Sequence, residues 1–145
     1  MRILLVNGPN LNTLGEREPE VYGTTTLAEI ESRVADRAKE LGAEVRAFQS
    51  NHEGAIVDFL QQEGPGADGI VINPAAFSHY SLALRDALAA SGKPAIEVHI
   101  SNIHGREWFR RRSVTGEVCR GVIAGLGWRG YLAAVEALVE ELKQS

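Results

Sequence analysis

The sequence predicts an α/β fold, in which a parallel sheet of five strands carries helices on both faces. Short apolar runs alternate along the chain with stretches whose apolar residues recur at helical spacing. The chain has 145 residues, which suits one domain with a core of its own. We therefore expect residues 1–145 to fold as a single, doubly wound α/β domain.

Five short runs, bounded by turn-forming residues, are expected to form the strands. They are residues 3–6, 44–48, 69–72, 95–100 and 122–126. Four stretches carry apolar residues on one helical face: residues 27–41, 54–63, 81–90 and 131–142. The first helix has clear end signals, because Thr26 is a candidate N-cap, Glu29 stands in the capping-box position and Gly42 follows it. This order of elements suits the flavodoxin-like plan, in which ligands bind at the carboxyl ends of the strands.

The composition limits the classes of function. Hydrophobic residues make up 44% of the chain and the net charge is −4, which argues against disorder and against a nucleic-acid partner. Cys119 is the only cysteine, so no internal disulfide can form and a reducing compartment is expected. No apolar run approaches the ~20 residues that span a membrane, and the apolar start is too short for a signal peptide. We expect a cytoplasmic protein with no membrane partner.

Polar residues are concentrated in the loops after the first, third and fourth expected strands. The first of these loops, residues 7–23, shows no helical pattern, and a long loop of this kind is often a lid. It contains neither a glycine-rich phosphate motif nor a Gly-Lys-Ser/Thr sequence, which argues against a nucleotide-binding domain. No Gly-x-Ser-x-Gly elbow is present either, and Cys119 stands beside a strand as a structural thiol would.

Glu97 and His99 are the first candidates for acid–base chemistry. Residues two apart on a strand point to the same face, so the carboxylate should contact the imidazole and fix its tautomer. That arrangement suits His99 as a general acid. Two other interpretations remain open at this point: an ion pair at a strand end, and a metal site completed by His104.

The loops offer further candidates. A free tyrosine has a pKa near ~10, so Tyr22 would need a cation such as Arg17 to act as a base, and it could instead only pack the loop. Arg110 could bind a carboxylate or polyol, or belong to a solvated basic face. Asn10 and Asn73 could bind hydroxyls, although asparagine is common in turns. The residues thus favour an enzyme that acts on a small, oxygen-rich, anionic substrate.

Together, the loop motifs resemble those of the type II 3-dehydroquinases, and the resemblance covers nearly the whole chain. It rests on six motifs in the family's order, which are Asn7-Gly8-Pro9-Asn10-Leu11-Asn12 with Arg17-Glu18-Pro19-Glu20-Val21-Tyr22-Gly23, Gln49-Ser50-Asn51-His52-Glu53-Gly54, Asn73-Pro74-Ala75 with His79, Ala83-Leu84-Arg85-Asp86-Ala87-Leu88, Glu97-Val98-His99-Ile100-Ser101-Asn102, and Arg106-Glu107 with Phe109-Arg110.

The resemblance implies a metal-free and cofactor-free lyase that dehydrates 3-dehydroquinate to 3-dehydroshikimate. The reaction would be an anti elimination through an enolate, in the shikimate pathway or in quinate catabolism. Tyr22 would remove the proton, helped by Arg17 on a lid of about residues 11–23. Asn10 would stabilise the enolate, and His99, oriented by Glu97, would protonate the departing hydroxyl.

The resemblance also implies the substrate contacts and the assembly. The implied set is Ile100 and Ser101 at the carboxylate, Asn73, His79 and Arg110 at the ring hydroxyls, Arg106 in lid closure, and Asp86 reaching a neighbouring subunit's site. The implied assembly is a dodecamer of trimers. None of the three lysines, Lys39, Lys93 and Lys143, is expected at a strand's carboxyl end, which argues against a Schiff-base route.

Three rival functions remain. An inactive relative used for binding would be expected to have lost Tyr22, Arg17 or His99, and all three are present. A flavodoxin-like nucleotide-binding domain would need a phosphate loop. A metal-dependent hydrolase would use His99 with His104.

Overall fold

The computed structural model describes residues 1–16 and 18–145, and for Val21 and Tyr22 it describes the backbone alone. Its five strands are all parallel and pair in the order β2-β1-β3-β4-β5. They are β1 (Arg2–Asn7), β2 (Glu44–Gln49), β3 (Gly69–Asn73), β4 (Ala95–His99) and β5 (Gly121–Ala124).

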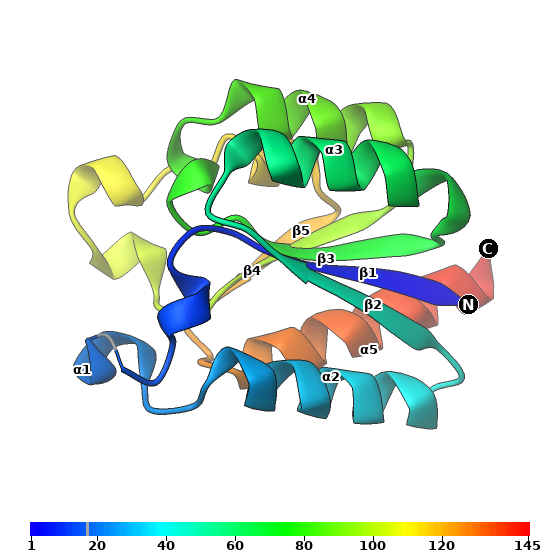
Figure 1. Cartoon of the computed structure of the whole chain (residues 1–145), viewed down its shortest axis with the longest axis horizontal. Helices are drawn as coiled ribbons and strands as arrows, with labels where there is room; N and C mark the ends of the chain where they lie inside the picture. The colour runs from blue at the N-terminus through cyan, green and yellow to red at the C-terminus, as the bar shows by residue number, and fades with distance from the viewer. Residues whose placement is uncertain (17) are drawn as a thin grey trace.

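Four long helices cover the sheet in two layers (Figure 1). They are α2 (Leu27–Glu40) and α5 (Arg129–Gln144) on one face, and α3 (Glu53–Glu63) and α4 (Leu82–Ser91) on the other. The predicted doubly wound α/β sheet of five parallel strands is therefore confirmed. Among the described residues, no helix is long and apolar enough to cross a membrane.

The predicted elements are all present, with ends that differ by no more than two residues. The predicted cap of α2 is also present, since the Thr26 hydroxyl accepts a hydrogen bond of 3.2 Å from the Glu29 backbone N–H. One prediction was wrong, because the loop expected to contain no helix forms the short helix α1 (Pro19–Tyr22). Pro19 favours a helical start through its fixed φ, but four residues are too few to give a periodic signal.

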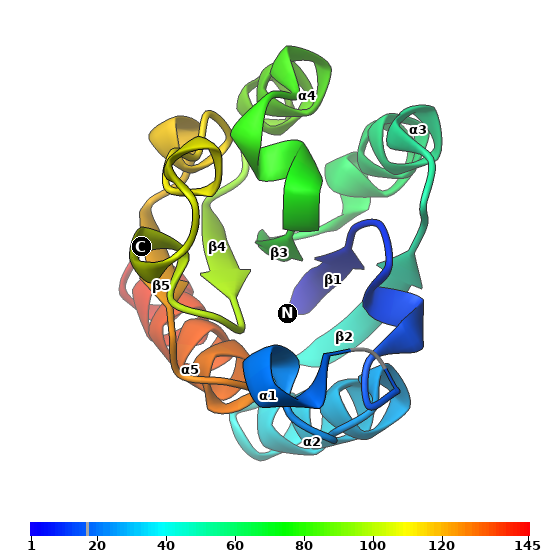
Figure 2. The same ribbon diagram turned by 90° about the vertical axis from the view of Figure 1, so that its left-hand side faces the viewer.

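Strand β1 lies at the point where the strand order reverses. It pairs with β2 on one side and with β3 on the other, and Asn7 at its end is level with both Gln49 and Asn73. Figure 2 faces this carboxyl edge, where α1 and the loops after β1, β3 and β4 lie. In open parallel sheets, ligands bind outside this edge at such a reversal.

The core has two layers because successive strand residues point to opposite faces. Along β1, Ile3 and Leu5 pack with the α2 and α5 side chains, whereas Leu4 and Val6 pack with those of α3 and α4. All four are fully buried, and burial of such a side chain contributes roughly 1.5–3 kcal/mol. This packing fixes the strand ends from which the polar loops project.

Candidate active site

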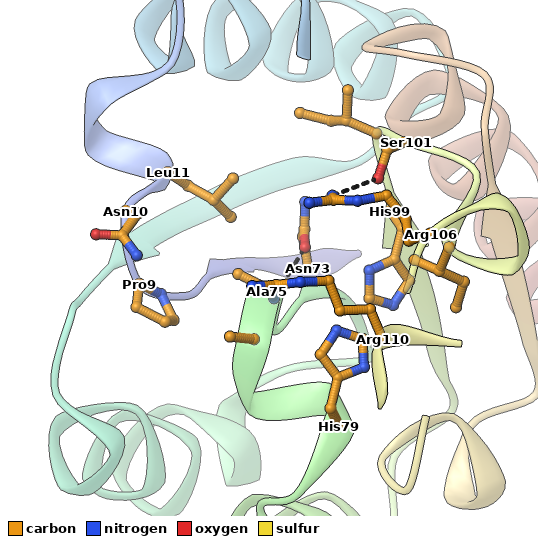
Figure 3. A pocket seen from close by; sticks show the side chains of 13 residues that line it. Pro9, Asn10, Leu11, Asn73, Ala75, His79, His99, Ser101, Arg106 and Arg110 are labelled. Atoms are coloured by element: carbon orange, nitrogen blue, oxygen red, sulfur yellow. Dashed lines mark hydrogen bonds between the residues drawn. The ribbon is translucent and has the colours of Figure 1, made fainter. Parts of the chain in front are cut away.

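The loops after β1, β3 and β4 enclose a cavity of about 140 Å³ at the carboxyl edge of the sheet (Figure 3). It is lined by Pro9, Asn10, Leu11, Asn73, Ala75, Ala76, His79, His99, Ile100, Ser101, Ile103, Arg106 and Arg110. The fold thus brings together eight of the residues that the sequence singled out. They are Asn10, Asn73, His79, His99, Ile100, Ser101, Arg106 and Arg110.

A buried carboxylate orients the imidazole at the end of β4. Nε2 of His99 lies 2.8 Å from Oε2 of Glu97, as expected for residues that share one strand face. The Ser113 hydroxyl donates to the same oxygen over 2.5 Å, and the Thr115 hydroxyl donates to Oε1. Because Nε2 of His99 is engaged with Glu97, Nδ1 is the ring nitrogen left for a ligand in the cavity.

These bonds keep Glu97 ionised. Burial alone would raise the pKa of the fully buried Glu97, but the bond and charge of His99 and the hydroxyls of Ser113 and Thr115 outweigh burial and lower it. Ser113 and Thr115 lie 16 and 18 residues along the chain from Glu97, and no sequence pattern marks them. The only available signal was that a charged residue inside an apolar strand must find donors.

The loop after β1 is held against the loops after β2 and β3. The backbone N–H of Asn10 donates to Oδ1 of Asn51 over 2.9 Å, and that of Gly8 donates to the Asn73 carbonyl over 2.8 Å. A Cβ at Gly8 would collide with the Pro74 carbonyl, so the two loops could not approach with any other residue there. The motif that begins at Asn7 therefore has a packing function as well as polar groups.

Asn73 is 3% exposed, and both ends of its amide have protein partners. Oδ1 accepts from the Ala75 backbone N–H over 3.0 Å, and Nδ2 donates to the Tyr131 hydroxyl over 2.8 Å. Ala75 has a φ of 52°, in the left-handed region, and it lines the cavity beside Asn73. One hydrogen of the Asn73 amide remains available to a ligand.

Three side chains that can carry a positive charge, His79, Arg106 and Arg110, also line the cavity. Nδ1 of His79 donates to the Arg112 carbonyl over 2.8 Å, which leaves Nε2 as the ring nitrogen available to a ligand. The His79 ring lies 6.5 Å from that of His99. Figure 3 shows Arg106 and Arg110 extending across the cavity from the loop after β4. Nη1 of Arg106 donates to the Ser101 hydroxyl over 3.3 Å.

The guanidinium of Arg110 is paired with a carboxylate through its Nε atom. Its Nε forms an ion pair with Oε2 of Glu107 at 2.8 Å, and this Nε has no hydrogen-bond partner among the described residues. No carboxylate side chain is among the described residues that line the cavity. An anionic ligand is therefore favoured over a cationic one.

Four candidates are not among the described residues that line this cavity. One is Glu97, which is connected to the cavity only through its contact with His99. Asp86 is exposed on α4 and does not line it. Tyr22 ends the backbone of α1, but its side chain lies outside the described residues, as does the whole of Arg17.

Neither His104 nor Cys119 is among the described residues that line the cavity. His104 is exposed, whereas Glu97 and His99 are buried, and no group of three His, Cys, Asp or Glu suited to a metal is found within the described part of the chain. Burial, with the nearby charge of Glu97, raises the pKa of Cys119 to about 12, so its thiol stays protonated.

The family model of class II dehydroquinases matches residues 1–139, which include every residue of the cavity. The chain belongs to the class II dehydroquinase family. It is 60% identical over 139 residues to the 3-dehydroquinate dehydratase of Roseiflexus castenholzii, covering 96% of this chain and 88% of that protein.

Solved structures of the class II dehydroquinase family agree with this fold. The type II dehydroquinase of Butyrivibrio crossotus superposes with a TM-score of 0.93 at 50% identity, covering 95% of this chain and 97% of that one. That of Propionibacterium acnes gives a TM-score of 0.92 at 45% identity, with 96% of each chain covered.

Proposed function

We propose that this chain is a 3-dehydroquinate dehydratase, a lyase that removes water from 3-dehydroquinate to give 3-dehydroshikimate. The observation that carries the proposal is the family match, which spans the whole cavity. The reaction is an anti elimination through an enolate. It is a step of the shikimate pathway towards aromatic amino acids, and quinate catabolism uses the same step.

Tyr22 is the base in this proposal. Its phenolate takes a proton from the carbon next to the substrate ketone, and the electron pair of that C–H bond moves to the ketone oxygen as an enolate. Arg17 favours the phenolate by its charge, and both belong to the proposed lid of about residues 11–23. Asn10 stabilises the enolate oxygen by hydrogen bonding, through a water molecule.

His99 is the acid in this proposal. Nδ1 donates a proton to the hydroxyl on the carbon that carries the carboxylate, the enolate collapses into a carbon–carbon double bond, and water leaves. The carboxylate of Glu97 supports this step because it bonds Nε2 over 2.8 Å and so holds the ring with Nδ1 towards the cavity. Tyr22 has gained one proton and His99 has lost one, and exchange with solvent resets both.

The remaining lining residues bind the substrate. The backbone N–H groups of Ile100 and Ser101 receive its carboxylate, on a turn whose carbonyl at Ile100 is held by the Gly127 N–H over 3.1 Å. The ring hydroxyls are bound by Asn73, His79 and Arg110, and Arg106 closes with the lid.

The proposed chemistry uses no metal and no organic cofactor. A Schiff-base route would need a lysine in the cavity. Lys39 and Lys143 are exposed on α2 and α5, and Lys93 lies in the turn before β4, at the opposite edge of the sheet. No lysine is among the described residues that line the cavity, which supports the enolate route.

We further propose a cytoplasmic dodecamer built from trimers, with residues 1–145 as one catalytic domain per subunit. Asp86 then acts in the site of a neighbouring subunit. Its exposed position on α4 supports this role, because it is free to meet another chain.

A direct assay tests the function. Purified protein is mixed with 3-dehydroquinate, and the ultraviolet absorbance of the conjugated enone-carboxylate product is followed, alone, with a chelator and with borohydride. We expect turnover that neither addition reduces. Absence of turnover from folded protein would reject the dehydratase, inhibition by the chelator would reject the metal-free route, and substrate-dependent inactivation by borohydride would indicate a Schiff base.

A further inference from the structure

Three buried polar side chains form a hydrogen-bonded network behind the cavity. The Tyr131 hydroxyl donates to Oδ1 of Asn7 over 2.7 Å and accepts from Nδ2 of Asn73 over 2.8 Å. Tyr131 and Asn7 are completely buried, and of the three only Asn73 lines the cavity. Tyr131 lies 58 residues from Asn73 and 124 from Asn7 along the chain, so the network ties α5 to the ends of β1 and β3.

The network fixes the orientation of the Asn73 amide. A hydroxyl has one proton, and because that of Tyr131 goes to the Asn7 oxygen, Tyr131 must accept from the Asn73 NH₂ group. The other end of the amide accepts from the Ala75 N–H over 3.0 Å. A half-turn of the amide would break both bonds. Burial raises the pKa of Tyr131, so its hydroxyl keeps the proton that this arrangement needs.

Stability alone does not account for these residues. Nδ2 of Asn7 is buried without a hydrogen-bond partner among the described residues, which costs free energy. Ala75 holds a left-handed backbone, which is also unfavourable for a residue with a Cβ. A phenylalanine at position 131 with an apolar residue at position 7 would avoid the unpaired amide. Unfavourable features of this kind persist where a site needs them.

We propose that Tyr131 is a positioning residue for substrate binding, which holds the Asn73 amide so that its second N–H meets a substrate oxygen in the cavity. The ligand group is a hydroxyl or carbonyl oxygen, since the available group is a donor. This inference rests on the proposed dehydratase function. Tyr131 does not touch the substrate, and it acts only through Asn73.

The Tyr131→Phe variant tests the proposal, because it keeps the buried ring and removes only the hydroxyl. We expect the KM for 3-dehydroquinate to rise about fivefold with kcat nearly unchanged. This is the result expected when the lost interaction stabilises the bound substrate and the transition state equally. KM does not depend on the amount of active enzyme. Partial unfolding of the variant would therefore lower the apparent kcat without imitating this result.

Two further variants separate positioning from a merely structural role. Asn7→Ala removes the other partner of Tyr131 and leaves the bond to Asn73, so we expect a lower urea midpoint but a smaller rise in KM. In the Asn73→Ala background, Tyr131→Phe should raise KM no further, because the group through which it acts is gone.

Failure of the role proposed for Tyr131 can be distinguished from failure of the proposed dehydratase function. Turnover by wild-type protein supports the dehydratase whatever the variants do, and its absence from folded protein overturns both. The role of Tyr131 is overturned if Tyr131→Phe keeps the wild-type KM, if Asn7→Ala raises KM as much, or if the effects of Tyr131→Phe and Asn73→Ala are additive.

Discussion

At the scale of the residue, the site depends on buried polar groups whose partners come from distant parts of the chain. Glu97 is enclosed by His99, Ser113 and Thr115, and these three donors let a charge persist inside the sheet. The same carboxylate binds and orients the imidazole that we propose as the acid. Stability and chemistry therefore depend on one ionised group, and both should respond to its removal.

Replacement of Glu97 by glutamine keeps the shape of the side chain and removes its charge. We expect kcat to fall by about 10²-fold, the scale of general acid catalysis, because His99 loses the charged partner that orients its ring. The exposed Glu44→Gln at the start of β2 is the control and should leave kcat unchanged. Equal activities of Glu97→Gln and wild type would reject the role of Glu97.

The same variant has a signature in stability. The pKa of Glu97 is lowered in the folded protein. Its ionised carboxylate therefore contributes fully to the free energy of unfolding above pH 4.5, the ordinary pKa of a glutamate, and this contribution is lost as the pH falls through the pKa of the folded protein. Urea denaturation should show the stability difference between wild type and Glu97→Gln shrinking on acidification. A difference that stays constant with pH would contradict the lowered pKa.

Tyr22→Phe should fold normally and lose most turnover, because it removes the proposed base and only one oxygen atom. Turnover should fall by about 10²–10⁴-fold, the range for loss of a general base. The circular dichroism spectrum and urea midpoint should match those of wild type. Near-normal kcat would show that another group removes the proton.

At the scale of the element, the cavity depends on how closely the loops after β1 and β3 approach each other. Gly8 lies against Pro74, and the Gly8 N–H bonds the Asn73 carbonyl over 2.8 Å. The sheet register places the ends of both strands at one level, so the loops meet directly. The position of Asn10 and Asn73 in the cavity follows from this contact.

Gly8→Ala should destabilise the protein by about 1–3 kcal/mol, because its methyl group would overlap the Pro74 carbonyl and force the loops apart. The matched control is Gly54→Ala in α3, where a Cβ meets nothing within 4 Å and should add up to about 1 kcal/mol of helix stability. Thermal unfolding of both variants, with the KM of Gly8→Ala, checks this. A Gly8→Ala protein as stable as wild type would mean that the loops separate easily.

At the scale of the whole molecule, the described cavity opens at one edge of the sheet, and Asp86 lies outside it on α4. One chain alone therefore gives Asp86 no contact with a ligand in that cavity. The proposed assembly supplies a neighbouring subunit for it to reach.

Asp86→Ala should weaken assembly or raise KM by several-fold while leaving kcat within about twofold, because the proposed contact binds and does not react. Light scattering after size exclusion gives the mass, and steady-state kinetics give KM. The control is Glu136→Gln, which changes an exposed residue on α5, 50 positions after Asp86 in the sequence. Wild-type mass together with wild-type KM would reject the role between subunits.

Local sequence patterns were enough to predict the succession of strands and helices, the parallel sheet and the loops that hold the polar residues. These follow from local patterns, such as the apolar run of β3 or the Thr26 cap, which a short stretch of chain encodes. The Glu97–His99 pair was also predictable, because strand geometry alone places both on one face. The short helix α1 was missed, since four residues give no periodic signal.

The hydrogen-bond partners of these residues, in contrast, depend on how the whole chain packs. Ser113 and Thr115 reach Glu97, and Tyr131 reaches Asn7 and Asn73, across 16 to 124 residues of chain. Nothing in a local pattern marks such partners. These partners meet only when the sheet and its helices pack. A buried charge or amide then needs a hydrogen bond from a polar group that the fold brings close to it.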